Sequence, residues 1–416
     1  MTETSPVNEN RKKIIGLHPN VFFMGLTSLL TDISSELIFT LIPIFLSNVL
    51  GATSTLVGLV GGISESADSF FRIASGWFSD KIGKRKLLAV FGYSFSTLAK
   101  PFMLMANSWA AVAGIRFGDR VGKGVRTASR DALIADSVGA NERGKGFGLH
   151  RAMDTAGAVI GLAIAAIIVY LVPGDKFHLD AQAYKWMVII GIVPAVLAVL
   201  VLITMVREHK KSATAKNIPA DTSKPAKNTP FSFQFKLYLA IMALFTLGNS
   251  SDFFLILDAQ HVQTPLLQVV LMLVLFNITY SLISMPMGIL SDKLGRKRVI
   301  VLGWFIYGLV YLGFALANNS WQIWLLFAVY GIYYGICEGA AKAFVADMVP
   351  VERRGTAYGL YNGIVGIMAL PASLIAGILW DKINPAATFY FGASLALLAM
   401  LGMLILIKEQ TVSPKS

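Results

Sequence analysis

The chain has 416 residues, of which 55% are hydrophobic and only 14% are charged. Soluble domains carry about 25% charged residues, so the composition excludes an ordinary soluble domain and indicates an integral membrane protein. The formal net charge of +12 does not indicate nucleic-acid binding, because the basic residues are divided by membrane side.

The apolar residues form twelve runs, each long enough to cross about 30 Å of hydrocarbon, which takes roughly 20 residues in a helix. Isolated strands would leave their backbone polar groups unpaired in lipid, so the runs predict an all-α bundle of twelve transmembrane helices. The predicted spans are residues 20–47, 55–78, 87–107, 109–138, 145–171, 185–206, 236–258, 267–290, 299–317, 321–349, 356–380 and 387–408.

The connections between the spans predict the topology. Most Lys and Arg residues outside the spans fall at the two ends of the chain and in alternate connections. The remaining connections hold only Lys176, Lys185 and Lys382. By the positive-inside rule, we expect a multi-pass plasma-membrane protein (inner membrane in a bacterium) with both termini in the cytosol.

A long polar connection divides the spans six and six. Residues 207–235 are rich in Lys, Pro, Ser, Thr and Asn and cannot bury a core, which predicts a mobile cytosolic linker. It separates an N-terminal six-helix bundle, residues 1–206, from a C-terminal six-helix bundle, residues 236–416.

Charged residues within the spans are candidates for a functional path. A charge at the bilayer centre costs about 2.5–3.5 kcal/mol even on a lenient scale, so these groups are expected to line a wet cavity or to pair. The first span places Asp32 and Glu36 one helical turn apart, and the fifth places His150 and Asp154 one turn apart beside Arg151. The fourth span carries a charged stripe on one face, formed by Arg116, Asp119, Arg120, Lys123, Arg126, Arg130 and Asp131.

The stripe has two interpretations. Its cations favour a substrate that carries a phosphate or carboxylate, whereas its acids, with those of neighbouring spans, favour internal salt bridges. Both interpretations remain open at the level of sequence. The C-terminal half supplies the polar candidates Asn249, Asp252, Asn277, Tyr280, Tyr333, Tyr334, Glu338 and Lys342. Of these, Asn249, Asp252, Asn277 and Glu338 are predicted for the path.

Several sequence segments of the first half of the chain recur in the second half. "GWFSDKIGKRK" at 76–86 is echoed by "GILSDKLGRKR" at 288–298, and "SSE" at 34–36 by "SSD" at 250–252. A longer match joins "ADSVGANERGKGFGLHRA" to "ADMVPVERRGTAYGLYNG", residues 135–152 and 346–363. Both halves have six spans and begin on the same side, which predicts parallel repeats with a central site at their interface.

The repeated loop fits the pattern Gly-x-x-x-Asp-(Arg/Lys)-x-Gly-(Arg/Lys)-(Arg/Lys) in both halves. By this signature the chain resembles the major facilitator superfamily, whose members have two such bundles. The matching positions are Gly76, Asp80, Lys81, Gly83, Lys84 and Arg85, and then Gly288, Asp292, Lys293, Gly295, Arg296 and Lys297. Two departures, Arg120 in place of Gly and Leu162 in place of Pro, argue against a standard drug–proton antiporter.

The resemblance implies a cytosolic gate that latches the two halves in the outward-open state. Asp80 is expected to face the start of the eleventh helix, where the helix dipole favours an acid, while Lys84 or Arg85 pairs with Asp136. Asp292 and Asp347 are expected to repeat these roles in the second half. The gate residues are therefore Gly76, Asp80, Gly83, Lys84, Arg85, Asp136, Gly288, Asp292, Gly295, Arg296 and Asp347.

These observations together predict a secondary active transporter that moves a small solute by alternating access. Coupling to protons is favoured because titratable acids line the expected path, and import and export fit equally well. The sequence predicts no enzyme, cofactor or metal site, and a monomer whose partners are the lipid bilayer, protons and a small solute, which is anionic under the first interpretation of the stripe. The alternative is a membrane sensor or interaction protein that keeps the fold without transport.

Overall fold

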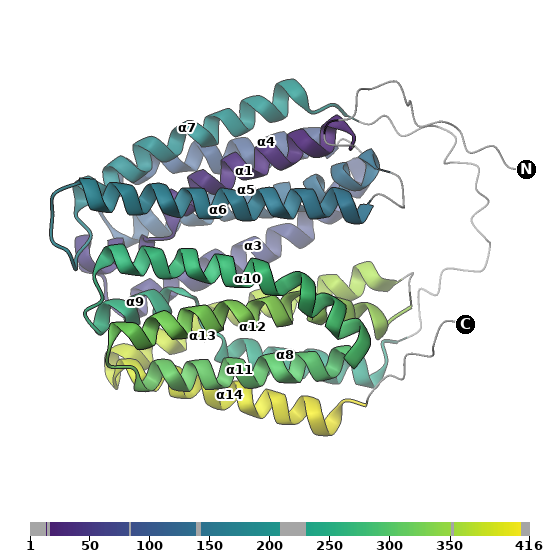
Figure 1. Ribbon diagram of the computed structural model, residues 1–416. Coiled ribbons are helices and arrows are strands. Elements are labelled where there is room, and N and C mark those ends of the chain that lie inside the picture. The colour runs from purple at the N-terminus through teal and green to yellow at the C-terminus, as the bar shows by residue number, and fades with distance from the viewer. Residues whose placement is uncertain are drawn as a thin grey trace, which may run out of the picture.

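The computed structural model describes residues 14, 17–82, 85–138, 143–208, 230–350 and 353–408; for residues 76–82, 136, 143 and 144 it describes the backbone alone. The predicted linker lies largely outside these ranges. Figure 1 shows two groups of long helices, α1–α7 and α8–α14, which meet along α6 and α10.

The first group forms the six predicted N-terminal spans. Its elements are α1 (Pro19–Phe39), α2 (Ile42–Ile44), the π-helix η1 (Phe45–Val49), α3 (Ser54–Ile82), α4 (Arg85–Ala99), the 3-10 helix η2 (Lys100–Met105), α5 (Trp109–Ser137), α6 (Arg143–Leu171) and α7 (Ala181–Met205).

The second group forms the other six spans. Its elements are α8 (Phe233–Gly248), α9 (Phe253–His261), α10 (Leu266–Leu294), α11 (Arg296–Leu316), α12 (Ser320–Asp347), α13 (Arg354–Lys382) and α14 (Pro385–Leu406). The predicted all-α architecture of twelve spans in two bundles is confirmed.

The first span of each half is interrupted at a corresponding place. α1 ends at Phe39 and continues as α2 and η1, whereas α8 ends at Gly248 and continues as α9. The sequence predicted one continuous span over each stretch, 20–47 and 236–258, because apolar residues predominate on both sides of the break. The interruptions lie just after the repeated "SSE" phrase and within the "SSD" phrase, so the halves share a backbone feature as well as a sequence.

Two of the twelve spans are less apolar than predicted. Among the described residues, ten helical spans are apolar enough to cross a membrane by composition, and α3 and α5 are not among them. Both have 29 residues, about 43 Å at 1.5 Å per residue, which is long enough to cross. Their charged side chains face the protein interior rather than lipid, as the next subsection describes.

The two ends of the bundle are distinct. At the end on the right of Figure 1, here called the terminal end, α1 and α8 begin and α7 and α14 end. Asn20 donates to the Arg207 carbonyl at 2.9 Å there, and Lys297 donates to the Ile407 carbonyl at 2.6 Å. The opposite end holds the connections 51–53, 172–180 and 262–265.

Close helix packing positions α5, the helix that carries the charged stripe. α4 and α5 cross at Gly92 and Gly122, and a Cβ atom added at Gly122 would lie 2.6 Å from the Gly92 carbonyl oxygen. Small residues allow such close backbone approach between membrane helices. This crossing fixes the distance of α5 from the outer helix α4 and holds its charged face toward the other half.

We expect Gly122→Ala to destabilise the protein by about 1–3 kcal/mol, because the methyl group overpacks the crossing. Gly114→Ala, on the same helix but with no neighbour within 4 Å of its Cβ position, is the matched control. Thermal unfolding in detergent should show a lower melting temperature for Gly122→Ala alone. Equal melting temperatures for the two variants would contradict this packing.

Candidate functional site

Two adjoining cavities lie between the halves. The first, the central cavity, has a volume of about 400 Å³ and is lined from α1, α3 and α5 on one side and α8–α10, α12 and α13 on the other. The second, the terminal cavity, has about 670 Å³ and lies nearer the terminal end, along α5, α6, α10 and α12. Four residues line both cavities and form the neck between them: Asp32, Lys123, Arg126 and Asn277.

Every path residue proposed from the sequence lines one of these cavities. The central cavity contains Asp32, Glu36, Arg116, Asp119, Arg120, Lys123, Asn249, Asp252 and Asn277. The terminal cavity adds His150, Arg151, Asp154 and Glu338. The high cost of charge in lipid explains the agreement, because that cost forces such groups toward the wet interior.

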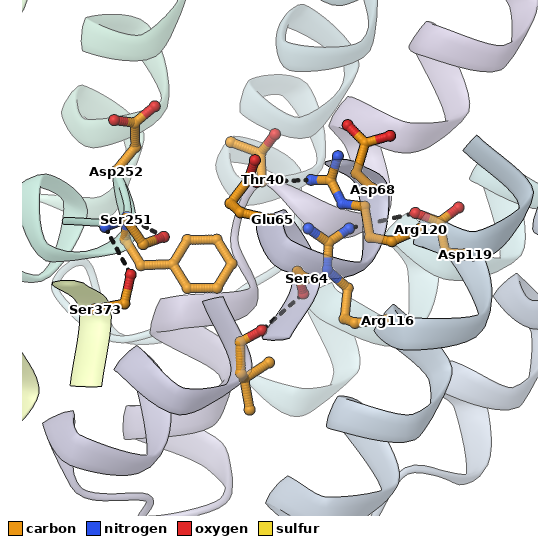
Figure 2. Close-up of polar contacts among 12 residues, drawn as sticks. Thr40, Ser64, Glu65, Asp68, Arg116, Asp119, Arg120, Ser251, Asp252 and Ser373 are labelled. Carbon is orange, nitrogen blue, oxygen red and sulfur yellow. Dashed lines mark hydrogen bonds and ion pairs between the residues drawn. The ribbon is translucent and has the colours of Figure 1, made fainter. Parts of the chain in front are cut away.

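Most of the charged stripe on α5 is paired. Arg116 lies 3.5 Å from Asp119 within α5, and Arg120 lies 3.5 Å from Glu65 on α3. Figure 2 shows both guanidinium groups pointing toward these carboxylates. Arg130 pairs with the adjacent Asp131 at 3.0 Å. For these three arginines, the structural interpretation of the stripe is supported.

Two cations of the stripe are not paired in this way. Within the described residues, neither the Lys123 ammonium nor the Arg126 guanidinium forms an ion pair or hydrogen bond, although Arg126 lies 4.6 Å from the Tyr93 ring centroid. The Arg126 side chain is buried, and its Nη1 atom has no partner among those residues. Both cations lie at the neck.

The acids on α1 face the same space. Glu36 accepts a hydrogen bond from Thr40 at the interruption of the first span, and Asp32 lies one turn earlier at the neck. Lys100, at the start of η2, is buried and donates to Ser34 at 2.8 Å. A lone Lys inside an apolar run was the only sequence signal for this contact.

The second half contributes an aromatic wall. Asp252, at the interruption of the seventh span, accepts hydrogen bonds from the Tyr330 hydroxyl at 2.6 Å and the Tyr334 hydroxyl at 3.5 Å. Phe276 packs edge-to-face on Tyr334 with ring centroids 5.4 Å apart, and both residues line the central cavity. The neighbouring Asn277 donates to the Leu273 carbonyl at 2.9 Å.

One carboxylate connects the halves across the terminal cavity. Glu338 on α12 lies 3.2 Å from Arg151 on α6 and 3.0 Å from Lys342 on its own helix, and it accepts a hydrogen bond from Tyr280. The side chains of Arg151 and Lys342 are 54% and 52% exposed. The terminal cavity therefore communicates with solvent. His150 lies 3.6 Å from Asp154 on the wall of this cavity.

The opposite end is closed by contacts between the halves. Asp381 at the end of α13 accepts hydrogen bonds from the backbone amides of Ser54 and Thr55, at 3.1 and 2.7 Å. The Leu266 amide donates to the Lys176 carbonyl at 2.8 Å. Together with the exposed terminal cavity, these contacts describe a molecule that is open toward its terminal end.

The predicted gate residues of the C-terminal bundle all lie within the described residues. Arg296 lies 3.1 Å from Asp347 and 3.3 Å from Asp292, all within the C-terminal bundle. Gly288 lies in α10, and Gly295 caps that helix with a positive φ of 91°, a conformation that favours glycine. The latch across the halves concerns another state and stays a prediction.

Fewer of the predicted gate residues of the N-terminal bundle lie within the described residues. Arg85 donates to the Ala132 carbonyl at 3.1 Å, and Gly76 lies within α3. Gly83, Lys84 and the side chains of Asp80 and Asp136 lie outside the described residues.

Some charged residues that line the cavities were not assigned to the predicted path. They include Glu65 in the central cavity and Arg72 and Lys342 in the terminal cavity. These residues were visible as charges within spans, so the sequence carried the same signal for them as for the residues that were chosen. The sequence does not reveal which charged residues of different spans form ion pairs. Those ion pairs decide whether a charge is neutralised within the protein or free to bind a ligand.

Two bundles enclosing a charged cavity that is open at one end define a membrane transporter. The model of the Major Facilitator Superfamily matches residues 24–267 and 237–416. The chain belongs to this superfamily, as its loop signature predicted.

Several known proteins are similar to this chain. An uncharacterised MFS-type transporter of Methanocaldococcus jannaschii is 39% identical over 406 residues, which cover 96% of each chain. The multidrug resistance protein MdtG of Serratia proteamaculans is 35% identical over 140 residues, about a third of each chain. The crystal structure of a D-xylose–proton symporter superposes with a TM-score of 0.75 at 14% identity, covering 94% of this chain and 97% of that one.

We expect Asp381→Asn to weaken closure of the opposite end. The carboxylate is solvent-exposed, so its loss should cost about 1 kcal/mol, a shift of about fivefold in the conformational equilibrium. The measurement is thiol labelling of Ile256→Cys, which lines the central cavity, in a Cys337→Ser background with reagent added from the opposite side.

The control for this experiment is Asp175→Asn. Asp175 is also an exposed acid at the opposite end, but it accepts hydrogen bonds within its own loop, from Phe177 at 2.9 Å. Faster labelling in Asp381→Asn alone would support the role of Asp381 in closure. Unchanged labelling would show that Asp381 does not hold this end closed.

Proposed function

We propose that the protein is a proton-coupled secondary active transporter, which moves a small solute through the central cavity by alternating access. The observation that carries this proposal is the pair of acids on α1, Asp32 and Glu36, exposed to a cavity that also reaches polar groups of the other half. A carboxyl group in such a position can take up a proton from one side and release it to the other.

Alternating access is supported by the unequal ends of the molecule. Contacts of Asp381 and Lys176 close one end, whereas the terminal cavity reaches solvent at the other. Two bundles that rock about the central cavity would exchange these states. The Arg151–Glu338 pair already joins α6 to α12 across the terminal cavity and lies where closure of that end would begin.

We place the terminal end in the cytosol of a plasma membrane. The basic residues of the described helix ends and connections are concentrated there, as the positive-inside rule requires. They include Arg85, Lys86, Arg207, Lys236, Lys293, Arg296, Lys297, Arg298, Arg353, Arg354 and Lys408. The opposite end has Lys176, Lys185 and Lys382. In this orientation the described state is open to the inside.

The orientation predicts which positions can be labelled from outside intact cells. Lys176→Cys in a Cys337→Ser background should react with a membrane-impermeant thiol reagent, whereas Lys86→Cys should react only after permeabilisation. Labelling of Lys86→Cys in intact cells would invert the topology.

The coupling proposal predicts that neutralising an acid on α1 separates solute movement from proton movement. In proteoliposomes loaded with a pH-sensitive dye and challenged with a panel of organic acids, sugars and drugs, at least one solute should change the internal pH. Glu36→Gln should abolish that change while still exchanging the solute down its own gradient, and Asp32→Asn tests the second acid.

Asp175→Asn, an acid outside the cavities, is the control and should behave as the unmodified protein. The proposal fails if no solute moves protons, or if Glu36→Gln and Asp32→Asn each accumulate solute normally under a pH gradient. In the second case, Asp154 beside His150 becomes the next proton carrier to test.

A further inference from the structure

We infer that the solute is a small organic anion that is carried together with a proton. Its anionic group binds between Lys123 and Arg126 at the neck, its apolar body packs against Phe276 and Tyr334, and the proton resides on Asp32. This inference rests on the proposed function and adds the class of substrate and the sense of coupling.

The charge balance of α5 selects the two cations. Arg116, Arg120 and Arg130 each have a carboxylate within 3.5 Å. Neither Lys123 nor Arg126 has one among the described residues, although both are enclosed by the protein. A buried charge without a partner is costly, and such cations favour an anionic ligand that supplies the missing charge.

The position of the two cations also favours a ligand. They line both cavities, so a molecule bound there lies midway between the opposite end and the terminal end. The Arg126 side chain is only 5% exposed, yet its Nη1 has no partner among the described residues. A guanidinium group presents a planar fork of donors that matches a carboxylate or phosphate.

The facing wall suits the rest of such a molecule. Phe276 and Tyr334 line the central cavity from the second half, and Phe276 also stacks on Tyr330 with ring centroids 5.6 Å apart. Asn277 lines the neck opposite the cations, and its amide nitrogen is engaged by the Leu273 carbonyl, which leaves its carbonyl oxygen toward other donors. A flat apolar body with one anionic group complements these surfaces.

Asp32 links the anion to a proton. Its carboxylate interacts electrostatically with both cations of the neck, so a charged Asp32 and a bound anion compete for the same positive charge. Protonation of Asp32 removes that competition. The other charged groups that act on Asp32 are Glu36 on α1, Asp154 on α6 and Lys100 on η2.

This competition determines the sense of coupling. If protonated Asp32 favours the anion, the anion favours protonated Asp32 by the same factor, because linkage between two bound ligands is reciprocal. Solute and proton therefore bind together and cross together. Under an inward proton gradient, the transporter imports the anion.

Isothermal titration calorimetry on the detergent-solubilised full chain tests the site without requiring transport. The probe is benzoate, with benzyl alcohol as a neutral molecule of similar shape. Benzoate should bind and benzyl alcohol should bind at least about tenfold more weakly, a difference of about 1.4 kcal/mol. Lys123→Gln and Arg126→Gln should each weaken benzoate at least about tenfold.

Two variants act as controls for the loss of charge. Lys185→Gln, an exposed cation at the opposite end, should bind benzoate as the unmodified protein does. Arg126→Lys keeps the charge without the planar fork and should recover part of the affinity that Arg126→Gln loses. Thermal unfolding of each variant confirms that the protein tested is folded.

The role of Asp32 protonation is tested by repeating the titration of the protein with benzoate between about pH 5 and about pH 8, a range in which a perturbed carboxyl group can titrate. Benzoate affinity should fall at least about tenfold as pH rises. Asp32→Asn, which is neutral throughout, should keep the higher affinity across the range.

The inference is overturned if benzoate binds no better than benzyl alcohol, or if the two Gln variants bind as tightly as Lys185→Gln. It is also overturned if Asp32→Asn and the unmodified protein share one pH dependence. A failure of the proposed function appears differently, as an absence of solute-driven proton movement in proteoliposomes.

Discussion

The cost of placing charge within a membrane governs the arrangement of this protein. α5 carries so many ionised groups that its charged face must be withheld from lipid, and the Arg120–Glu65 pair ties that face to α3. α3 in turn packs along α13 of the other half, where Gly58 meets the Ser373 backbone and Gly62 meets that of Leu370. The least apolar helices therefore lie at the centre, and the cavity between the halves is polar as a consequence.

The same cost explains what the sequence can predict. Spans follow from apolar length, and charges within them face the interior because lipid would penalise them, so most of the charged residues that line the cavities could be named from the sequence. Pairing was not predictable between spans. Arg120 meets Glu65, and Lys100 meets Ser34, only because α3, η2 and α1 pack against α5 in three dimensions. The interruption near Thr40 was also missed, because apolar stretches on either side conceal a break in the helix.

The two halves share a backbone plan but differ in chemistry. Each has an acid next to the interruption of its first span, Glu36 in one half and Asp252 in the other. Glu36 accepts a hydrogen bond from Thr40, which directly follows its own helix, whereas Asp252 accepts hydrogen bonds from tyrosines of α12 that belong to a large aromatic cluster. The repeated halves have a common helical plan, and their different residues give the cavity a cationic wall that faces an aromatic one. A symmetric cavity would present the same groups to a polar molecule in two equivalent orientations. The two different walls of this cavity distinguish those orientations.

In the proposed transport cycle, closure of the terminal end depends on the charge at the neck. The Arg151–Glu338 pair is half-exposed, and such pairs contribute about 0–1 kcal/mol, too little to hold the halves together. Closing would also remove water from Lys123 and Arg126, and that desolvation is costly while the cations lack a counter-charge. Two arrangements of negative charge reduce this desolvation cost. The empty carrier has a charged Asp32, and the loaded carrier has a bound anion beside a protonated Asp32. A protonated carrier without anion leaves both cations uncompensated and remains open. Under the proposed coupling, only the empty deprotonated form and the doubly loaded form close, so the proton and the solute cross together, and the coupling follows from charge balance at Asp32, Lys123 and Arg126.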